Sequence, residues 1–399
     1  MVHTSSKQAS SRPALFARIV GGAWIALALL LAELVFPGHA SADGGAPNLA
    51  YVAGTAQGIS VIDIQQQKVT KTISVAGDPH TVLLSLDGRF LYVSQPGLNR
   101  VSILSASTGQ TICSATVAGQ PSLLTIDPGT NTLYAAGSGA NSISGLSDTT
   151  CALKQTITLK SPVYGMMVAV VGTGDNGGTG NQLWVSENND LVYYDSTGKQ
   201  LGSFAIPGGP QYITIPTGSF IYTTTRQGAV YAVDLNTLKL TGPLISDGPF
   251  GTMDYDAVTD EIYVPNLQKE QIEVLAPLIT GASVPHEPAR TIPLGVKPQS
   301  IAITSDGQLG FVALSGGNVA MLDIPGRQLI NTIHVGGDPQ FIITGLYPPV
   351  IGTTPQQASF WTTVATVLAY VLVVALIIIP ILFYRRYSRA RTFKMKKRE

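Results

Sequence analysis

Short apolar stretches alternate with turns rich in Gly, Pro and Asp between residues 49 and 345. Many stretches consist of β-branched and aromatic residues, as in 59–63 (Ile-Ser-Val-Ile-Asp) and 230–234 (Val-Tyr-Ala-Val-Asp). None of them has the spacing of apolar residues that an amphipathic helix needs. The pattern therefore predicts an all-β domain of short strands.

A proline-containing turn recurs through this region, at intervals of 39 to 49 residues. The prolines are Pro79, Pro121, Pro162, Pro210, Pro249, Pro298 and Pro339. This interval is typical of a four-stranded propeller blade. Each repeat reads as four strands, of which the first follows the proline and the second has a Tyr-Val-like core.

The two ends of the repeat region complement each other. Residues 49–75 supply strands two, three and four of a unit, whereas 340–345 supply only a first strand. Together the ends complete a seventh unit, which a linear solenoid does not require. We therefore expect a seven-bladed β-propeller over residues 43–346, closed by pairing of the N- and C-terminal strands.

Three second strands carry degenerate forms of the tetrapeptide Tyr-Val-Thr-Asn, beginning at Tyr51, Tyr92 and Tyr263. With the Gly-Asp-Pro and Asp-Gly turns, these motifs resemble the YVTN-repeat β-propellers, which are exported bacterial and archaeal proteins. The resemblance implies the fold and a surface location, but no defined activity. A more distant resemblance is to lactonase-type and quinoprotein-like propellers.

The N-terminus has the order of a secretory signal. Lys7, Arg12 and Arg18 precede an apolar run at 19–36, and the small residues 40–42 (Ala-Ser-Ala) follow it. We expect residues 1–42 to be a cleaved signal peptide; an uncleaved N-terminal anchor is the alternative.

The C-terminus predicts a membrane anchor. Residues 360–384 contain no charge and are long enough for a helix to cross a bilayer. The tail, 385–399, has eight Lys and Arg residues, which places it in the cytoplasm. Residues 347–359 read as a Pro-containing juxtamembrane linker. The sequence thus predicts a single-pass type I protein of the plasma membrane, with an extracytoplasmic propeller and the lipid bilayer as partner of 360–384.

The net charge of zero, from 24 basic and 24 acidic residues, hides an uneven distribution. Residues 43–359 have 13 Lys and Arg against 22 Asp and Glu, which gives −9, and the tail has 8 − 1 = +7. An acidic propeller is a poor ligand for nucleic acid, so no nucleic-acid partner is expected.

Motifs for catalysis are absent from the sequence. His80, His286 and His334 lack metal-ligand spacing, and no Ser stands in a nucleophile elbow. The Gly-x-Gly-x-x-Gly at 172–177 is not followed by the helix that a dinucleotide site requires. We therefore expect no metal or cofactor and a binding or scaffold function rather than an enzyme.

Three alternatives stay open. A lactonase-like hydrolase with a divalent cation, or a quinoprotein-like oxidoreductase, could place its site in the central channel. The second needs clamping Trp residues, whereas Trp184 is the one Trp between residues 43 and 359. The third alternative is a structural protein of the cell envelope.

The topology itself indicates a binding site. First strands of propeller blades line the channel, so the residues that follow the seven prolines should surround one mouth. They are His80, Ser122, Val163, Gln211, Phe250, Gln299 and Gln340. Five are polar, and Tyr164 and Tyr212 add stacking surface. We expect a protein, peptide or small ligand at this mouth; alternatively, these polar groups only solvate the rim.

Cys113 and Cys151 are the two cysteines of the chain. In an exported domain they could form a disulfide, and two free buried thiols are the alternative. Two insertions, 171–181 and 276–289, should lie on the face opposite the predicted mouth, as solvated loops.

Overall fold

The computed structural model describes residues 49–171, 180–216, 220–344 and 350–351. The predicted signal peptide (1–42), membrane span (360–384) and cytoplasmic tail (385–399) lie outside the described residues, as does most of the linker 347–359. Within the described ranges no helix is long and apolar enough to cross a membrane.

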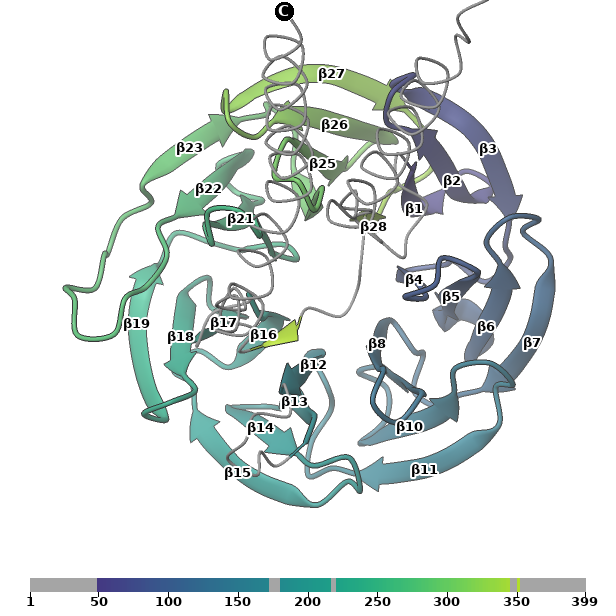
Figure 1. The fold of residues 1–399 in the computed structure, drawn as a ribbon, viewed down its shortest axis with the longest axis horizontal. Helices are drawn as coiled ribbons and strands as arrows, with labels where there is room; N and C mark the ends of the chain where they lie inside the picture. The colour runs from purple at the N-terminus through teal and green to yellow at the C-terminus, as the bar shows by residue number, and fades with distance from the viewer. Residues whose placement is uncertain (1–48, 172–179, 217–219, 345–349, 352–399) are drawn as a thin grey trace, which may run out of the picture. The chain divides into compact units, whose positions relative to one another are not determined.

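The described domain consists of seven sheets of four antiparallel strands, one of which has an additional short strand, arranged around a common centre (Figure 1). One sheet joins the two ends of the domain: β28 (Phe341–Thr344), β1 (Leu49–Thr55), β2 (Gly58–Asp63) and β3 (Lys68–Ser74). In each sheet the strand that begins at or after a repeat proline is the innermost of the four antiparallel strands, and we name the sheet by this strand. The fold is therefore the expected seven-bladed β-propeller.

The other six sheets follow in chain order. The first three are β4 (Val82–Leu84), β5 (Phe90–Gln95), β6 (Arg100–Ser105), β7 (Thr111–Thr116); β8 (Leu123–Asp127), β9 (Thr132–Ala136), β10 (Ser142–Ser147), β11 (Leu153–Thr158); and β12 (Gly165–Val171), β13 (Gln182–Ser186), β14 (Asp190–Tyr194), β15 (Gln200–Ala205). The last three are β16 (Pro210–Thr214), β17 (Phe220–Thr225), β18 (Val230–Asp234), β19 (Lys239–Ile245); β20 (Asp254–Tyr255), β21 (Ile262–Asn266), β22 (Gln271–Leu275), β23 (Arg290–Pro293); and β24 (Pro298–Ile303), β25 (Leu309–Leu314), β26 (Asn318–Asp323), β27 (Gln328–His334). A 3₁₀ turn, η1 (Pro96–Leu98), joins β5 to β6.

The N- and C-terminal strands pair in one register. β28 lies antiparallel to β1, with Ile343 opposite Tyr51 and Phe341 opposite Ala53. Ile342 is 1% exposed and packs in one cluster with Val52 and Phe311. The contacts of β28 therefore include both a backbone ladder and an apolar core.

The second strand of every sheet places an aromatic side chain in the core. These residues are Tyr51, Tyr92, Tyr134, Trp184, Tyr222, Tyr263 and Phe311, each at most 3% exposed. They include the tyrosines of the three Tyr-Val motifs, so the motif has a packing role here. Truncation of a buried aromatic side chain costs about 3–5 kcal/mol.

The loop 276–289, which joins β22 to β23, is largely exposed, as expected, but it also contacts a neighbouring blade. The backbone N–H of Leu278 donates to the Tyr222 hydroxyl at 3.3 Å, and the Thr280 hydroxyl donates to Asp234 at 3.1 Å. Leu278 and Val284 also pack against the core of the neighbouring β16 sheet. Leu278 and Val284 thus attach the insertion to the preceding blade.

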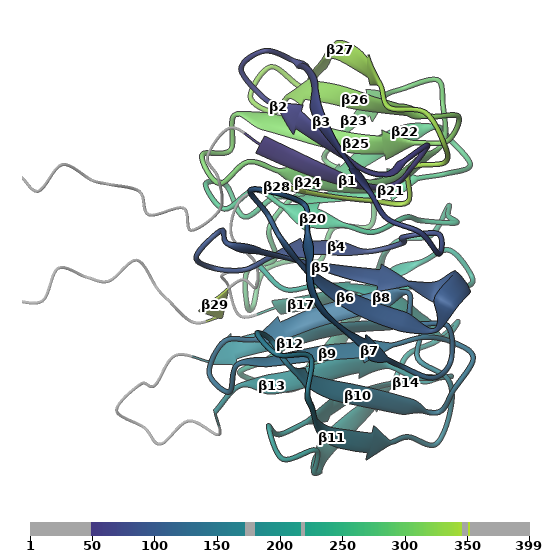
Figure 2. The ribbon, with the colours of Figure 1, turned by 90° about the vertical axis from the view of Figure 1, so that its right-hand side faces the viewer.

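A short strand, β29 (Val350–Ile351), lies within the stretch predicted as a linker. It pairs in parallel with the end of β12, at Val170 and Val171. Figure 2 shows β29 on the side of the domain where β12 ends. At its two described residues, this part of the chain therefore belongs to the propeller.

The cysteines form a disulfide between neighbouring blades. Cys113 on β7 is bonded to Cys151, which follows β10, with a Cα–Cα distance of 5.9 Å. The bond connects residues 38 positions apart and joins the β4 sheet to the β8 sheet.

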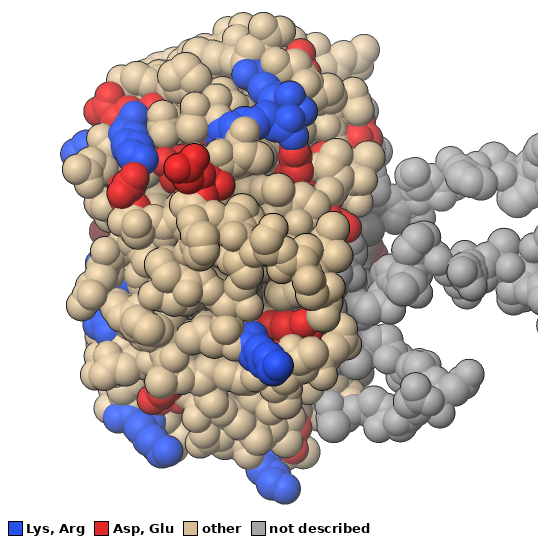
Figure 3. Space-filling model, turned by 90° about the vertical axis from the view of Figure 1, so that its left-hand side faces the viewer, with Lys and Arg blue, Asp and Glu red and all other residues tan. Residues whose placement is uncertain are grey.

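Charged side chains of both signs are interspersed on the side of the domain that Figure 3 shows. Most of that surface consists of uncharged residues, as expected for a chain with only 12% charged residues. No basic stripe of the kind that follows a nucleic-acid backbone runs across this side.

Candidate functional site

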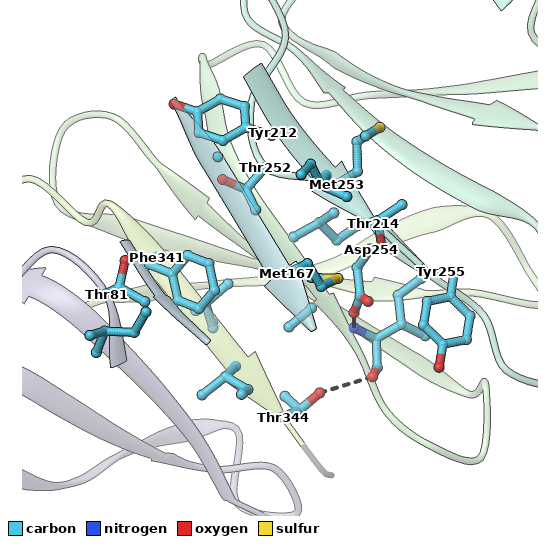
Figure 4. Close-up of a pocket in the computed structure, with 18 of the residues that line it drawn as sticks. Thr81, Met167, Tyr212, Thr214, Thr252, Met253, Asp254, Tyr255, Phe341 and Thr344 are labelled. Atoms are coloured by element: carbon cyan, nitrogen blue, oxygen red, sulfur yellow. Dashed lines mark hydrogen bonds between the residues drawn. The ribbon is translucent and has the colours of Figure 1, made fainter. Parts of the chain in front are cut away.

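The inner strands enclose a cavity of about 340 Å³. All seven sheets contribute to its wall: residues 80–81 before β4, 123–124 on β8, 165–167 on β12, 212–214 on β16, 252–255 at β20, 301–303 on β24 and 341–344 on β28. Figure 4 shows side chains from several of these strands pointing toward one space. The cavity is therefore the central channel that the repeat pattern predicts.

Hydroxyl groups satisfy backbone groups of the inner strands at positions where no further strand pairs with their inner edge. The N–H of Val168 donates to the Thr125 hydroxyl at 3.1 Å, across the β8 and β12 sheets. The N–H of Ile342 likewise donates to the Ser300 hydroxyl at 3.1 Å. These contacts fix neighbouring blades to each other without any charged group.

At β20 a carboxylate, instead of a hydroxyl group, accepts the hydrogen bond from the neighbouring strand. The N–H of Ile303 on β24 donates to Oδ2 of Asp254 at 2.7 Å (Figure 4). Asp254 is partly exposed to the cavity, and Met167 and Tyr255 lie beside it. The site therefore contains a carboxylate in a mostly apolar wall.

The backbone before β20 explains why this carboxylate meets Ile303. The N–H of Thr252 donates to the carbonyl of Gln299, and the N–H of Ile301 donates to the carbonyl of Thr252, at 2.9 and 3.2 Å. Gly251 permits this approach, because a Cβ atom there would lie 2.2 Å from the Gln299 oxygen. Two residues further on, the next inward amide of β24 is bonded to the Asp254 side chain instead of a carbonyl.

Asp254 occupies a position that is equivalent in all seven blades. In each sheet, one residue of the first strand lies opposite the buried aromatic residue of the second. These first-strand residues are Ile343, Leu83, Thr125, Met167, Thr214, Asp254 and Ala302. Six are apolar or carry a hydroxyl, so Asp254 is the ionisable exception.

Burial raises the pKa of Asp254 to about 7, against an ordinary value of 3.8. The N–H groups of Ile303 and Tyr255 oppose this shift because they stabilise the anion, and the nearby charge of Asp256 adds to it. A carboxyl group with this pKa exchanges its proton near neutral pH, which is a property common among functional groups.

His80 and Tyr212 are the predicted mouth residues that line the cavity. Burial lowers the pKa of His80, and the Ser122 carbonyl partly opposes that shift. Burial also raises the pKa of Tyr212. These two side chains therefore present uncharged polar groups at neutral pH.

The remaining predicted residues do not line this cavity. Val163 and Phe250 are 1% and 3% exposed and belong to the core. The Gln299 amide donates to the Ser315 hydroxyl at 2.7 Å, and the Gln340 amide donates to Asp338 at 2.7 Å. The ring that the sequence predicted as one site is thus divided between cavity, core and rim.

Tyr164, Ser122 and Gln211 also lie outside the cavity wall. The Arg226 guanidinium lies 4.3 Å from the centre of the Tyr164 ring and also donates to the carbonyl of Asn188. Ser122 accepts the Thr81 hydroxyl through its carbonyl at 2.5 Å. Gln211 is half-buried next to Tyr212. These three residues thus contact other protein groups and do not line the cavity.

A smaller polar cleft of about 170 Å³ lies between the β11–β12 and β13–β14 loops. Its buried carboxylate, Glu187, accepts the Tyr194 hydroxyl at 2.6 Å and the Ser161 hydroxyl at 3.4 Å. Because hydroxyl groups already bond to both oxygens of Glu187, this cleft is a weaker candidate than the central cavity.

In the parts of the chain that the structure describes, no group of three or more His, Cys, Asp or Glu residues could hold a metal ion. Trp184 is fully buried and stacks on Tyr193 at 4.5 Å between ring centres. Its side chain therefore belongs to the core of the β12 sheet.

Sequence reasoning did not identify Asp254. The available signal was a carboxylate within a first strand, six residues before the turn residue Asp260, where other blades have apolar or hydroxyl side chains. Which of the neighbouring acids, Asp254 or Asp256, lies in the wall depends on where the short β20 strand begins.

The comparisons support the fold alone. No protein-family model matches the chain, and no curated protein matches it. A functionally unknown protein from Desulfotomaculum acetoxidans is similar in structure, with TM-score 0.62, 13% identity, and coverage of 75% of this chain and 99% of that one. Hydrazine synthase of Kuenenia stuttgartiensis gives TM-score 0.58 and 18% identity, over 73% of this chain and 93% of that one.

A third similar structure is the β-propeller domain of Myceliophteria thermophila Cps50 (Swd1), with TM-score 0.55 and 13% identity. It covers 67% of this chain and 89% of that domain. The three similar structures therefore include an enzyme, hydrazine synthase, and the Cps50 (Swd1) propeller domain. The shared fold does not indicate the function.

Proposed function

We propose that this chain is an exported β-propeller of the YVTN-repeat type that binds a small ligand in its central cavity. The signal-like N-terminus and the uncharged stretch 360–384 support export and a tether to the plasma membrane. The pairing of β28 with β1 supports a ring that the two ends of the domain close.

The observation that carries the proposal is the cavity itself. Its volume of about 340 Å³ falls within the usual range for small-molecule pockets, roughly 300–1,000 Å³. Its wall is largely apolar, with a few hydroxyl groups and the Asp254 carboxylate. Such a wall binds the apolar body of a ligand and orients it through the polar groups.

The first and last strands of the propeller show which face its two ends occupy. Ala50, near the start of β1, lies opposite Thr344, at the end of β28. Both ends therefore leave the domain on the face where first strands end, which is opposite the predicted mouth at His80 and Tyr212. An extracytoplasmic ligand, peptide or protein would reach the cavity through that mouth.

Ligand binding is tested with the full chain in lipid nanodiscs, with 2-phenylethanol as an uncharged aromatic probe. We expect saturable binding by calorimetry in the unmodified chain, and loss of binding in Met167→Trp, because the larger side chain fills the cavity. Ile279→Trp is the matched control, since Ile279 is 72% exposed on the loop 276–289. No binding by the unmodified chain, or equal binding by Met167→Trp, contradicts the proposal.

The membrane topology has a separate test. A protease added outside intact cells should digest the propeller and leave a reporter fused after residue 399 intact. Digestion of the reporter, or protection of the propeller, contradicts an extracytoplasmic domain with a cytoplasmic tail.

Asp254 also favours a second candidate function, hydrolysis in the same cavity. A carboxylate whose pKa is about 7 suits a general base at neutral pH. The test is a lactone-hydrolysis assay with and without added calcium. Turnover that is lost in Asp254→Asn supports an enzyme, and turnover that persists in this variant excludes Asp254 as the base.

A further inference from the structure

We propose that the central cavity selects ligands that carry a protonated amine, with the Asp254 carboxylate as their counter-ion. The inference rests on the proposed ligand-binding function of this cavity and specifies the class of ligand.

The charge balance of the wall is the first argument. The residues that line the cavity include the carboxylate of Asp254 but no Lys or Arg. The ion pairs found among the described residues join Arg89 to Asp87, Lys269 to Asp247 and Glu273, and Arg290 to Glu261. None of them includes Asp254, so no cationic side chain of the described domain neutralises its negative charge. A ligand cation would supply the missing charge.

The second argument is that the structural task of Asp254 does not need a charge. At the equivalent position of the β8 sheet, the Thr125 hydroxyl accepts the N–H of Val168 on the next blade. Asp254 accepts the N–H of Ile303 in the same way. A hydroxyl is therefore sufficient to join two blades, and the carboxylate adds a negative charge on the cavity wall.

The wall around the carboxylate suits an amine with an apolar body. Met167 and Met253 contribute polarisable thioethers, and Tyr255 and Phe341 contribute aromatic rings. Aromatic faces attract cations, and methionine adapts to apolar groups of different shape. Because burial lowers the pKa of His80, its ring adds no positive charge that would repel such a ligand.

The titratable groups near Asp254 determine the pH at which it can act as a counter-ion. On its own strand and turn these groups are Tyr255, Asp256 and Asp260, and on the paired strand β21 Tyr263 lies opposite it. The facing strand β24, Pro298–Ile303, has no ionisable side chain. The carboxylate form therefore predominates above about pH 7, where burial has placed the pKa.

The test compares two probes of almost the same shape, 2-phenylethylammonium and neutral 2-phenylethanol, on the full chain in nanodiscs. At about pH 8 we expect the cation to bind roughly ten- to a hundredfold more tightly, as for a hydrogen bond to a charged group. In Asp254→Asn and Asp254→Thr, which both keep an oxygen acceptor for Ile303, the two affinities should become equal. Asp338→Asn removes an exposed carboxylate at the rim and should keep the preference.

A second comparison needs no variant. At about pH 5 the Asp254 carboxylate of the unmodified chain is protonated, so the preference for the cation should disappear. If 2-phenylethanol binds as tightly as the cation at about pH 8, the inference is wrong and the ligand-binding function stands. If neither probe binds, both are wrong.

Discussion

The Oδ2 atom of Asp254 accepts a 2.7 Å hydrogen bond from the backbone N–H of Ile303, on the inner strand of the next blade. At the equivalent position of the β8 sheet, the Thr125 hydroxyl accepts the N–H of Val168. Both bonds satisfy an amide that has no neighbouring strand, but only one of them brings a charge into the cavity. The effects of that charge on stability and on binding can be measured separately.

Asp254 should make the stability of the domain depend on pH. Its pKa is about 7 in the folded chain and near 3.8 in the unfolded one, so between these values only the folded chain holds the proton. The free energy of unfolding then falls as the pH rises through this window. When the pH rises from about 5 to about 8, the free energy of unfolding of Asp254→Asn should increase by roughly 2–3 kcal/mol relative to that of the unmodified chain. Urea unfolding at both pH values measures this difference.

Asp195→Asn is the matched control for this experiment. The Thr197 hydroxyl and backbone N–H groups hold the pKa of Asp195 below its ordinary value. Its carboxylate is therefore ionised in both states above about pH 5, and the variant should not alter the pH dependence there. An equal change in both variants contradicts the role given to Asp254.

The terminal strand β28 should contribute to stability through its buried face. Ile342 is 1% exposed and lies opposite Val52 on β1. Ile342→Ala should lower the free energy of unfolding by about 2–4 kcal/mol, because it leaves a cavity in the shared core. Ile330→Ala, at a position 44% exposed on β27, should change it by less than about 0.5 kcal/mol. Equal effects of the two variants contradict a stabilising β1–β28 contact.

The disulfide should stabilise the domain because it lowers the conformational entropy of the unfolded chain. For a sequence separation of 38 residues, the chain-entropy model gives about 3–4 kcal/mol. Replacement of both Cys113 and Cys151 by Ser should lower the free energy of unfolding by this amount. A reducing agent should destabilise the unmodified chain similarly and leave the double variant unchanged. A reduced chain as stable as the oxidised one would contradict this prediction.

Binding in the cavity and binding at the rim predict different effects of mutation. His80 lines the cavity, whereas the Gln299 amide donates to Ser315 and does not. His80→Ala should weaken binding of 2-phenylethanol about tenfold, as expected for loss of part of an apolar wall. Gln299→Ala should bind normally. If Gln299→Ala weakens binding and His80→Ala does not, the result favours binding at the mouth that the sequence predicted.

The sequence predicts the blades well because the same turn and strand residues recur in each blade. Pro79 and Pro298 each end a turn that begins an inner strand, and Tyr92 and Tyr263 mark the buried second strands. The disulfide was one of two alternatives because the sequence does not give the distance between the Cα atoms of Cys113 and Cys151. The signal peptide, membrane span and tail stay predictions, since they lie outside the described residues.

The binding site was harder to predict than the fold. Membership of the cavity wall depends on which side of each inner strand a residue faces, and a shift of one residue reverses it. Phe250 thus points into the core, whereas Tyr212 lines the cavity. For Asp254 the neighbouring sheet also matters, because its partner Ile303 is 49 residues away. Because the sequence does not show this contact with Ile303, it gives no reason to prefer Asp254 over Asp256 as the cavity residue.

The most direct test of the account is proton release when the amine binds. Calorimetry of 2-phenylethylammonium binding, in buffers of different ionisation enthalpy at about pH 7, measures the protons that leave the protein. Because the pKa of Asp254 is about 7 and pairing with a cation lowers it, the unmodified chain should release about half a proton per ligand. Asp254→Asn should release none. Binding without proton release in the unmodified chain, or equal release from both, would contradict a ligand site built around Asp254.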